Sequence, residues 1–306
     1  MFELLQQEFA RNALMAGTMV AVITAIVGYF VVLRSQAFAS EALTDIGFAG
    51  ATGAAVLGIG ALPGMFILTI LAALGMGALG ERIRGRDVEI GMILSFALGL
   101  GVLFLALYTQ FGSNSSEGVN VLFGSILSVT SSDLLITLIS GCSILLALAL
   151  LFRPLLFASI DPDVALARGV PVQMLSVVFL ILLGIATAEA VFIVGVLLAL
   201  ALLIAPAATA LRLTHRPLTS IVLAIALGVG ITWGGLLLAF TGIGNHLPVG
   251  FYIATLAATA YFVSIPLSRL RFPRRYRPLP HPTRECGPVA EHRLRSIEKH
   301  RKETNS

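Results

Sequence analysis

Charged residues are scarce in this sequence: Asp, Glu, Lys and Arg together make up 12% of its 306 residues. A soluble globular domain averages about 25%. Hydrophobic residues make up 57% of the chain, and its mean hydropathy is +0.95. A chain this apolar has too few polar side chains to cover a water-exposed surface. Its composition excludes a soluble fold and predicts a polytopic protein embedded in the lipid bilayer.

Several catalytic and nucleotide-binding motifs are missing. The sequence has no Gly-x-x-x-x-Gly-Lys-Ser/Thr loop, no His-Glu-x-x-His, no Cys-x-x-Cys and no Gly-x-Ser-x-Gly. Without the first motif the chain does not hold ATP in a P-loop, so we expect no enzyme here and any ATP hydrolysis in a separate subunit. The two cysteines, Cys142 in an apolar stretch and Cys286 in a polar one, predict neither a disulfide nor a redox centre. No permanently bound cofactor is expected.

Basic residues are few outside the C-terminal end. Of the 20 Lys and Arg residues, 11 follow residue 268, where four acidic residues accompany them. Residues 272–306 show no apolar period, which is typical of a disordered tail, and residues 1–271 are predicted to form the membrane domain. Such local basicity suits a cytoplasmic surface or lipid headgroups. It does not favour nucleic-acid binding, because no aromatic side chains alternate with the basic ones.

Apolar stretches recur along the chain at lengths suited to membrane helices, which predicts an all-α bundle of about nine transmembrane spans. Basic residues gather at alternate ends of these stretches, at Arg34, 82–86, 153–168, 212–216 and in the tail. By the positive-inside rule these ends are cytoplasmic, so we expect a multi-pass protein of the cytoplasmic membrane with its N-terminus outside and its C-terminus inside. The predicted spans lie near 13–33, 46–59, 61–80, 88–109, 133–152, 171–188, 190–211, 218–240 and 249–268.

Four ionisable residues in or beside the spans are candidates for a metal-binding or translocation pathway. Glu41 and Asp45 are four residues apart, which places both carboxylates on one helical face at the start of the short, Gly-rich span 46–59. Glu189 lies in an apolar run between two spans near the outer side, and His246 lies in an external turn. Ionisable residues at membrane depth usually serve function. The alternatives are two acids in a first helical turn, a loop acid and a turn histidine.

A polar segment between two spans, residues 161–171, reads Asp-Pro-Asp-x-Ala-x-Ala-Arg-Gly-Val-Pro. Its first residue can cap a helix, its first proline can occupy the first helical position and its glycine can close the last turn. The pattern predicts a short helix on the cytoplasmic surface, against which an ATP-driven motor could push; an ordinary connector is the alternative. The candidate coupling residues are Asp161, Asp163, Ala165, Arg168 and Gly169.

Two stretches predict irregular backbone within the membrane. Pro206 stands inside a long apolar run, where proline frees a carbonyl group and bends a helix, so it marks either a gate or a simple bend. Residues 110–132 begin polar and end apolar, and the apolar half is too short to cross the bilayer. We expect a re-entrant or interfacial helix there.

Three of these segments, in this order and spacing, carry a family resemblance. They are Leu-Phe-Gly-Ser-Ile-Leu at 122–127, the polar segment 161–171 and the Pro206-containing run 194–210. The chain resembles the permease family of metal-ion ABC importers, which serves zinc, manganese and iron uptake. The resemblance implies a homodimeric or paired permease with two ATP-binding subunits docked on residues 161–169. It also implies an extracytoplasmic metal-binding protein that delivers the ion, and alternating-access transport into the cytoplasm.

The sequence departs from the family pattern at two places. Where the family has Asp-Ala-x-Ser-His-Ala, this chain reads Glu-Ala-Leu-Thr-Asp-Ile at 41–46, so Asp45 takes the histidine position. Where the family has Asp-x-Pro-x-Gly, this chain begins with His246. A carboxylate is a harder ligand than imidazole. If these residues touch the ion, the exchange favours manganese or ferrous iron over zinc.

Other functions compete with this interpretation. A secondary transporter could couple protons or sodium through Asp45 and Glu189 without any ATPase partner, but no convincing internal repeat supports it. An ABC permease for a metal chelate or vitamin would need a wide, uncharged pathway. A membrane scaffold would have no use for buried acids in a Gly-rich span.

Overall fold

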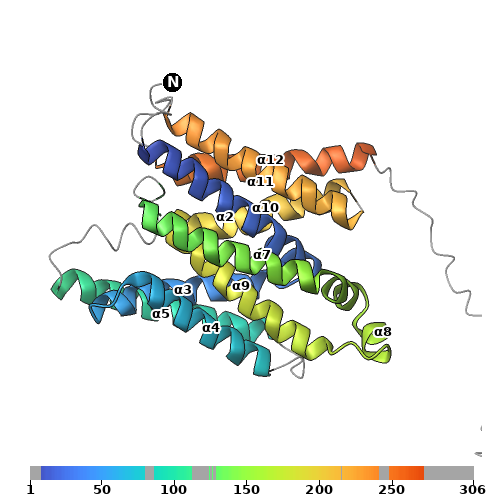
Figure 1. Cartoon of the computed structure of the whole chain (residues 1–306), viewed down its shortest axis with the longest axis horizontal. Helices are drawn as coiled ribbons and strands as arrows, with labels where there is room; N and C mark the ends of the chain where they lie inside the picture. Colours follow the sequence, from blue (N-terminus) through green and yellow to red (C-terminus); the bar gives the residue numbers. More distant parts are fainter. Residues whose placement is uncertain are drawn as a thin grey trace, which may run out of the picture. The chain divides into compact units, whose positions relative to one another are not determined.

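The computed structural model describes residues 8–79, 86–111, 124, 126, 129–214, 216–240 and 248–271. Within these ranges the regular structure is helical throughout, so the prediction of an all-α bundle is confirmed (Figure 1). The helices are α2 (Glu8–Leu33), α3 (Ala37–Val56), α4 (Ala61–Leu79), α5 (Arg86–Phe111), α7 (Ser131–Ile160), α8 (Pro162–Ala167), α9 (Val172–Val194), α10 (Val196–Leu213), α11 (Pro217–Phe240) and α12 (Val249–Arg271).

Eight of the described helices are long and apolar enough to cross a membrane. Helix α3 is the candidate for a ninth crossing, which agrees with the predicted number. It has 20 residues, enough for a length of about 30 Å, but its acids and small residues lower its hydropathy. Most of α3 is buried against other helices, so its polar groups face protein instead of lipid.

The predicted bounds of this short span, 46–59, are wrong at both ends. Helix α3 begins at Ala37 and ends at Val56. A search for apolar windows stops at acidic residues, whereas the backbone continues as a helix through Glu41 and Asp45 because neighbouring helices cover it. The turn that precedes α3 contains Ser35, whose φ of 54° is left-handed.

The spans predicted at 171–188 and 190–211 meet at a different residue than expected. Helix α9 continues through Glu189 to Val194, and a single residue, Gly195, separates it from α10. Gly195 has φ 88° and ψ 162°, a conformation that only glycine adopts without strain. Glu189 interrupts the apolar run in the sequence and so set the predicted boundary, but the break between the two helices is at Gly195.

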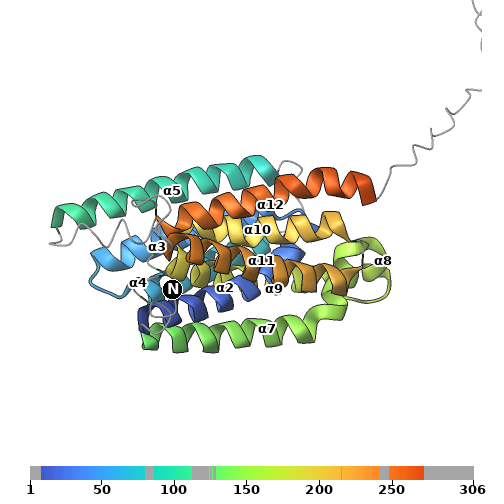
Figure 2. The same ribbon diagram turned by 90° about the horizontal axis from the view of Figure 1, so that it is seen from above.

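The arrangement of helices decides which acids can meet. Helix α3 packs on α4 and α5, α2 packs on α10, α11 and α7, and α9 contacts α2, α3, α4 and α7. Figures 1 and 2 show α7 and α5 on different sides of the bundle. Helix α9 therefore stands between the region of α3 and the region of α7.

Three predicted features fall largely outside the described residues. They are the disordered tail 272–306, the re-entrant segment within 110–132, and the loop that contains His246. These expectations stay predictions. Residues 1–268 form one compact unit, and residues 269–306 form a second, of which the last three residues of α12 are described.

Candidate cation pathway and docking helix

Glu41 and Asp45 lie on α3, in its second and third turns. The alternative interpretation, acids stabilised in a first helical turn, is therefore wrong for both. Asp45 is 7% exposed, Glu41 is partly buried, and the two are close enough for their charges to repel each other. Two neighbouring carboxylates on a largely buried helix form a site of negative charge that attracts cations.

The pair faces α5. Thr52 lies two turns beyond Asp45 on the same face of α3, and its hydroxyl donates to the carbonyl oxygen of Gly101 on α5 at 3.3 Å. Side chains of α3 and α5 also meet at Phe48 with Gly101 and at Gly53 with Phe104. Residue numbers rise together in these pairs, so the two helices run parallel and Asp45 lies opposite the α5 turn that precedes Gly101.

Glu189 has surroundings of its own. The alternative of a loop acid between two spans is wrong, because Glu189 lies inside α9 and is 3% exposed. Its carboxylate faces α7: a Cβ atom placed on Gly141 would lie 3.4 Å from Oε1, and the Ser140 hydroxyl also faces the acid. Within the described part of the chain, neither carboxylate oxygen has a partner at good hydrogen-bond geometry.

The structure brings together Glu41 and Asp45 but keeps Glu189 apart from them. Helix α9 packs against both α3 and α7, and the carboxylate of Glu189 is on the α7 side. His246 lies outside the described residues. In the ranges that the structure describes, no group of three or more His, Cys, Asp or Glu side chains could hold a metal ion.

The predicted surface helix is confirmed as α8, with the cap that its sequence indicates. The Val164 amide donates to Asp161 Oδ1 at 3.0 Å, and proline occupies the first turn. Gly169 follows with φ 80°. This left-handed conformation ends a helix, and glycine adopts it without strain. The guanidinium of Arg168 lies 6.0 Å from the ring centre of Phe157 at the end of α7.

The side chains of α8 divide into an anchor and an exposed face. Ala165 is fully buried and joins a hydrophobic cluster formed largely by α2, α7 and α9. It therefore holds α8 on the bundle and is not available to a partner. Val164 and Leu166 are 42% and 54% exposed, and Asp163 and Arg168 are exposed beside them. The sequence analysis missed these two apolar residues, because their exposure depends on which face of α8 docks.

Pro206 lies inside α10 and is buried. On the adjoining face of α10, Leu203 and Ala207 pack closely on α2 at Gly28, where an added Cβ would overlap the Leu203 carbonyl oxygen. The proline therefore lies in a tightly packed contact between two spans. Whether it acts as a gate or as a bend stays a prediction.

Comparisons with known proteins give this geometry a context. The chain is 32% identical over 264 residues to "Manganese transport system membrane protein MntC" of Halalkalibacterium halodurans, covering 86% of this chain and 89% of that one. It is 30% identical to "Manganese import system permease protein ScaB" of Streptococcus parasanguinis, covering 85% and 90%.

Two solved structures share the fold. "PsaBC from Streptococcus pneumoniae in complex with Fab" matches with a TM-score of 0.75 and 30% identity, covering 85% of this chain and 92% of that chain. "An inward-facing conformation of a putative metal-chelate type ABC transporter" matches with a TM-score of 0.65 and 20% identity, covering 84% and 85%. At that lower identity, the second match shows the fold alone.

A family model covers nearly all of the membrane bundle. The model described as ABC 3 transport family matches residues 6–268, which include every helix from α2 to α11 and most of α12. The extent of this match and the identity to MntC lead to one conclusion: the chain belongs to the ABC 3 transport family.

Proposed function

We propose that this chain is the membrane-spanning permease subunit of an ATP-driven importer for a divalent metal ion, with manganese as the first candidate. Relatives at 30% and 32% identity are named as manganese transport proteins. The structural observation that carries the proposal is the carboxylate pair Glu41 and Asp45, which is held at membrane depth with no basic residue between 35 and 80. The uncompensated negative charge would lower the cost of a cation at this depth.

The chemistry of the pair favours a hard cation. Carboxylate oxygens suit manganese and ferrous iron, while zinc is bound well by imidazole and thiolate. Two carboxylates do not complete the coordination shell of such an ion, which takes about six oxygen ligands. Water, His246 or a second permease copy would supply the remaining ligands. The ion is cargo in this proposal and is not a cofactor of the chain.

Helix α8 is the proposed contact for an ATP-binding subunit. A short helix with exposed Val164 and Leu166 and a buried Ala165 offers a partner an apolar face on a rigid support. The permease would act as a homodimer or pair, receive its ion from an extracytoplasmic binding protein and alternate between outward and inward access. Its C-terminus would be cytoplasmic and its N-terminus external.

A proton- or sodium-coupled secondary transporter is the alternative. It would couple protons or sodium through Asp45 and Glu189, but the Glu189 carboxylate lies on the α7 side of α9, away from α3, and nothing in the geometry favours such coupling. The chelate permease is supported only by the structural match at 20% identity, which shows a shared fold and not a shared cargo. The ABC importer of a free ion therefore remains the better supported function.

Transport in a defined membrane tests the proposal. The permease would be co-expressed with an ATP-binding subunit, reconstituted into vesicles with its binding protein, and supplied with ATP and Mn²⁺. We expect ATP-dependent accumulation of Mn²⁺ that excess Fe²⁺ reduces more than equal Zn²⁺ does. Uptake without any ATPase, driven by a proton or sodium gradient alone, would contradict the proposal and establish the secondary transporter.

Docking on α8 is tested by changing its exposed face without changing its anchor. Leu166→Asp should reduce co-purification of the ATP-binding subunit, because a charge replaces an apolar contact. Ala167→Asp, at a neighbouring exposed position, is a matched control for the added charge, and we expect it to have a smaller effect. If Leu166→Asp purifies as a folded protein and retains full ATPase binding, α8 is not the docking helix.

A further inference from the structure

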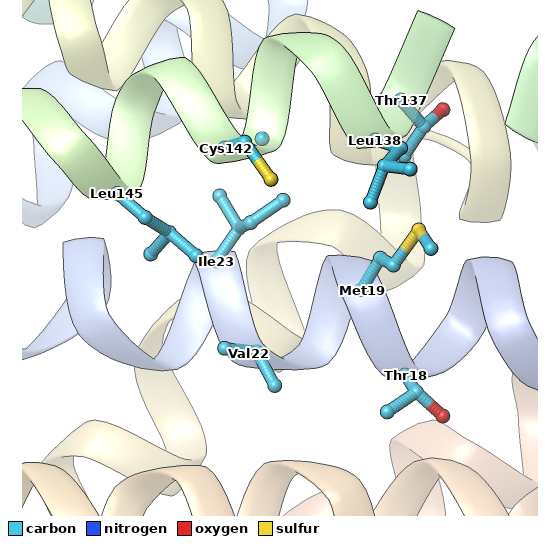
Figure 3. Close-up of a pocket in the computed structure, with 9 residues that line it drawn as sticks. Thr18, Met19, Val22, Ile23, Thr137, Leu138, Cys142 and Leu145 are labelled. Atoms are coloured by element: carbon cyan, nitrogen blue, oxygen red, sulfur yellow. The ribbon is translucent and has the colours of Figure 1, made fainter. Parts of the chain in front are cut away.

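A groove lies between α2 and α7, and none of the functions above uses it. It has a volume of about 180 Å³, and its lining is almost entirely apolar. In Figure 3, Met19 and Ile23 of α2 rise toward α7, while Cys142 and Leu145 of α7 point toward α2. Both helices qualify as membrane spans, so the groove is within reach of molecules dissolved in the bilayer. A dry apolar cavity of about 150 Å³ is large enough to bind benzene.

The inner wall of this groove separates it from the carboxylate of Glu189. Gly141 lines the groove, and a Cβ placed on it would lie 3.4 Å from Glu189 Oε1 and would overlap the end of Ile23. The flexible end of Ile23, which lines the groove, and the Glu189 carboxylate therefore both lie beside Gly141. Both carboxylate oxygens are buried and have no partner at hydrogen-bond geometry among the described residues.

No basic side chain of the surrounding helices neutralises this acid. The sequence has no Lys, Arg or His in 12–33, 37–79, 134–152 or 172–211, which are the stretches of the long helices packed around Glu189. The guanidinium of Arg34 stacks on Phe179 at 5.3 Å, ten residues and roughly 15 Å along α9 from Glu189. A carboxyl group without a counter-charge in an apolar environment is costly unless it is neutral or gains a cationic partner.

We propose that the groove between α2 and α7, with Glu189 behind Gly141, is a binding site for a hydrophobic amine that enters from the bilayer. The hydrocarbon part of the ligand fills the apolar groove, and its ammonium group reaches Glu189 when the Ile23 side chain turns aside. The site combines hydrophobic burial with charge complementarity, because an apolar groove leads to an acid that lacks a cation. It is separate from the acidic pair on α3 and does not depend on metal transport.

Cys142 provides a reporter inside the groove, since its sulfur points into it (Figure 3). In a Cys286→Ser background Cys142 is the single thiol, because the chain has two cysteines. The protein would be placed in phosphatidylcholine nanodiscs, and the rate of Cys142 modification by benzyl methanethiosulfonate would be measured with octylamine, octanol or ethylamine present. We expect octylamine to slow modification severalfold, octanol to slow it less and ethylamine to leave it unchanged.

Two variants test the role of the acid. Glu189→Gln should reduce protection by octylamine to the level of octanol, and Gly141→Ala should do the same with the acid in place, because the new Cβ blocks the path. Glu8→Gln, at an exposed acid in the first turn of α2, should keep full protection by octylamine. Thermal unfolding of each variant in nanodiscs shows whether it is folded.

Three results would overturn the proposal. Equal protection by octylamine and octanol, or full protection by octylamine in folded Glu189→Gln, would show that the groove takes hydrocarbon alone, such as a lipid chain. No protection by either compound would show that the groove binds neither. Because the assay contains no metal ion and no ATPase, failure of metal transport would not affect its result.

Discussion

Two buried acids on neighbouring helices, Asp45 and Glu189, differ in the groups that surround them. Asp45 shares a face of α3 with a second acid, and that face packs on α5. Glu189 stands alone on α9, behind the wall of an apolar groove lined by α2 and α7. Burial is similar in both, at 7% and 3% exposure. Burial alone therefore does not identify the pathway, while the nearby charges and the helix that each acid faces separate the two sites.

The helices that hold these acids are packed in different ways. Helix α3 approaches α4 so closely that a Cβ on Gly50 would lie 2.6 Å from the carbonyl oxygen of Gly64. At the other site, a Cβ on Gly141 would meet the end of the Ile23 side chain, which can rotate. Helix α3, which carries the acidic pair, has a backbone contact with α4 that cannot yield, whereas the side chain beside Gly141 and Glu189 can rotate.

The largest effect is expected at Asp45. Asp45→Ala should lower ATP-dependent Mn²⁺ uptake into vesicles by more than about tenfold, equivalent to at least 1.4 kcal/mol, because the more deeply buried carboxylate of the pair is lost. Uptake would be compared at equal amounts of folded permease with its ATPase bound. Normal uptake by a folded Asp45→Ala variant would show that the acidic pair is not part of the cation pathway.

A smaller loss is expected at Glu41, which is only partly buried. Glu41→Gln should reduce the same uptake by a factor of about three, because one charge of the pair is removed where water still screens it. The variant keeps the shape of the side chain, so its expression and melting temperature serve as controls. A loss equal to that of Asp45→Ala would mean that both acids contact the ion directly.

The packing contrast predicts unequal stability losses for two Gly→Ala changes. Gly50→Ala should destabilise the protein by about 1–3 kcal/mol, since the new methyl group meets backbone atoms. Gly141→Ala should cost less, because Ile23 can change its rotamer. Thermal unfolding in the same detergent measures both. Similar losses would contradict the idea that the groove wall yields more easily than the α3–α4 contact.

The smallest effect on transport is expected at Glu189. Glu189→Gln should change Mn²⁺ uptake by less than about twofold, because its carboxylate has no contact with the acidic pair and amide and acid have similar volumes. Uptake by Asp45→Ala in the same vesicles provides the scale. Loss of transport in Glu189→Gln would return Glu189 to the cation pathway, as the sequence alone indicated.

The sequence predicted helical regions more accurately than their ends. Hydropathy located the membrane helices, and the Asp-Pro-Asp segment predicted α8 with its cap, because capping depends on residues next to one another. The hydropathy of the sequence also placed the start of α3 at 46 and a break between spans at Glu189. Both boundaries were wrong, because acids lower hydropathy even where neighbouring helices bury them. Ala165 was expected to contact a partner, yet its burial makes it an anchor.

Composition and local pattern by themselves determined the class of this protein: an all-helical membrane bundle with a capped surface helix and without a P-loop. These properties depend on average hydropathy and on neighbouring residues, which the linear chain specifies directly. Only the tertiary structure decided that Glu189 and Asp45 belong to different regions and that α8 exposes Val164 and Leu166. The physical reason is that long-range helix packing assigns each face of a helix to a neighbour, and no local pattern contains that assignment.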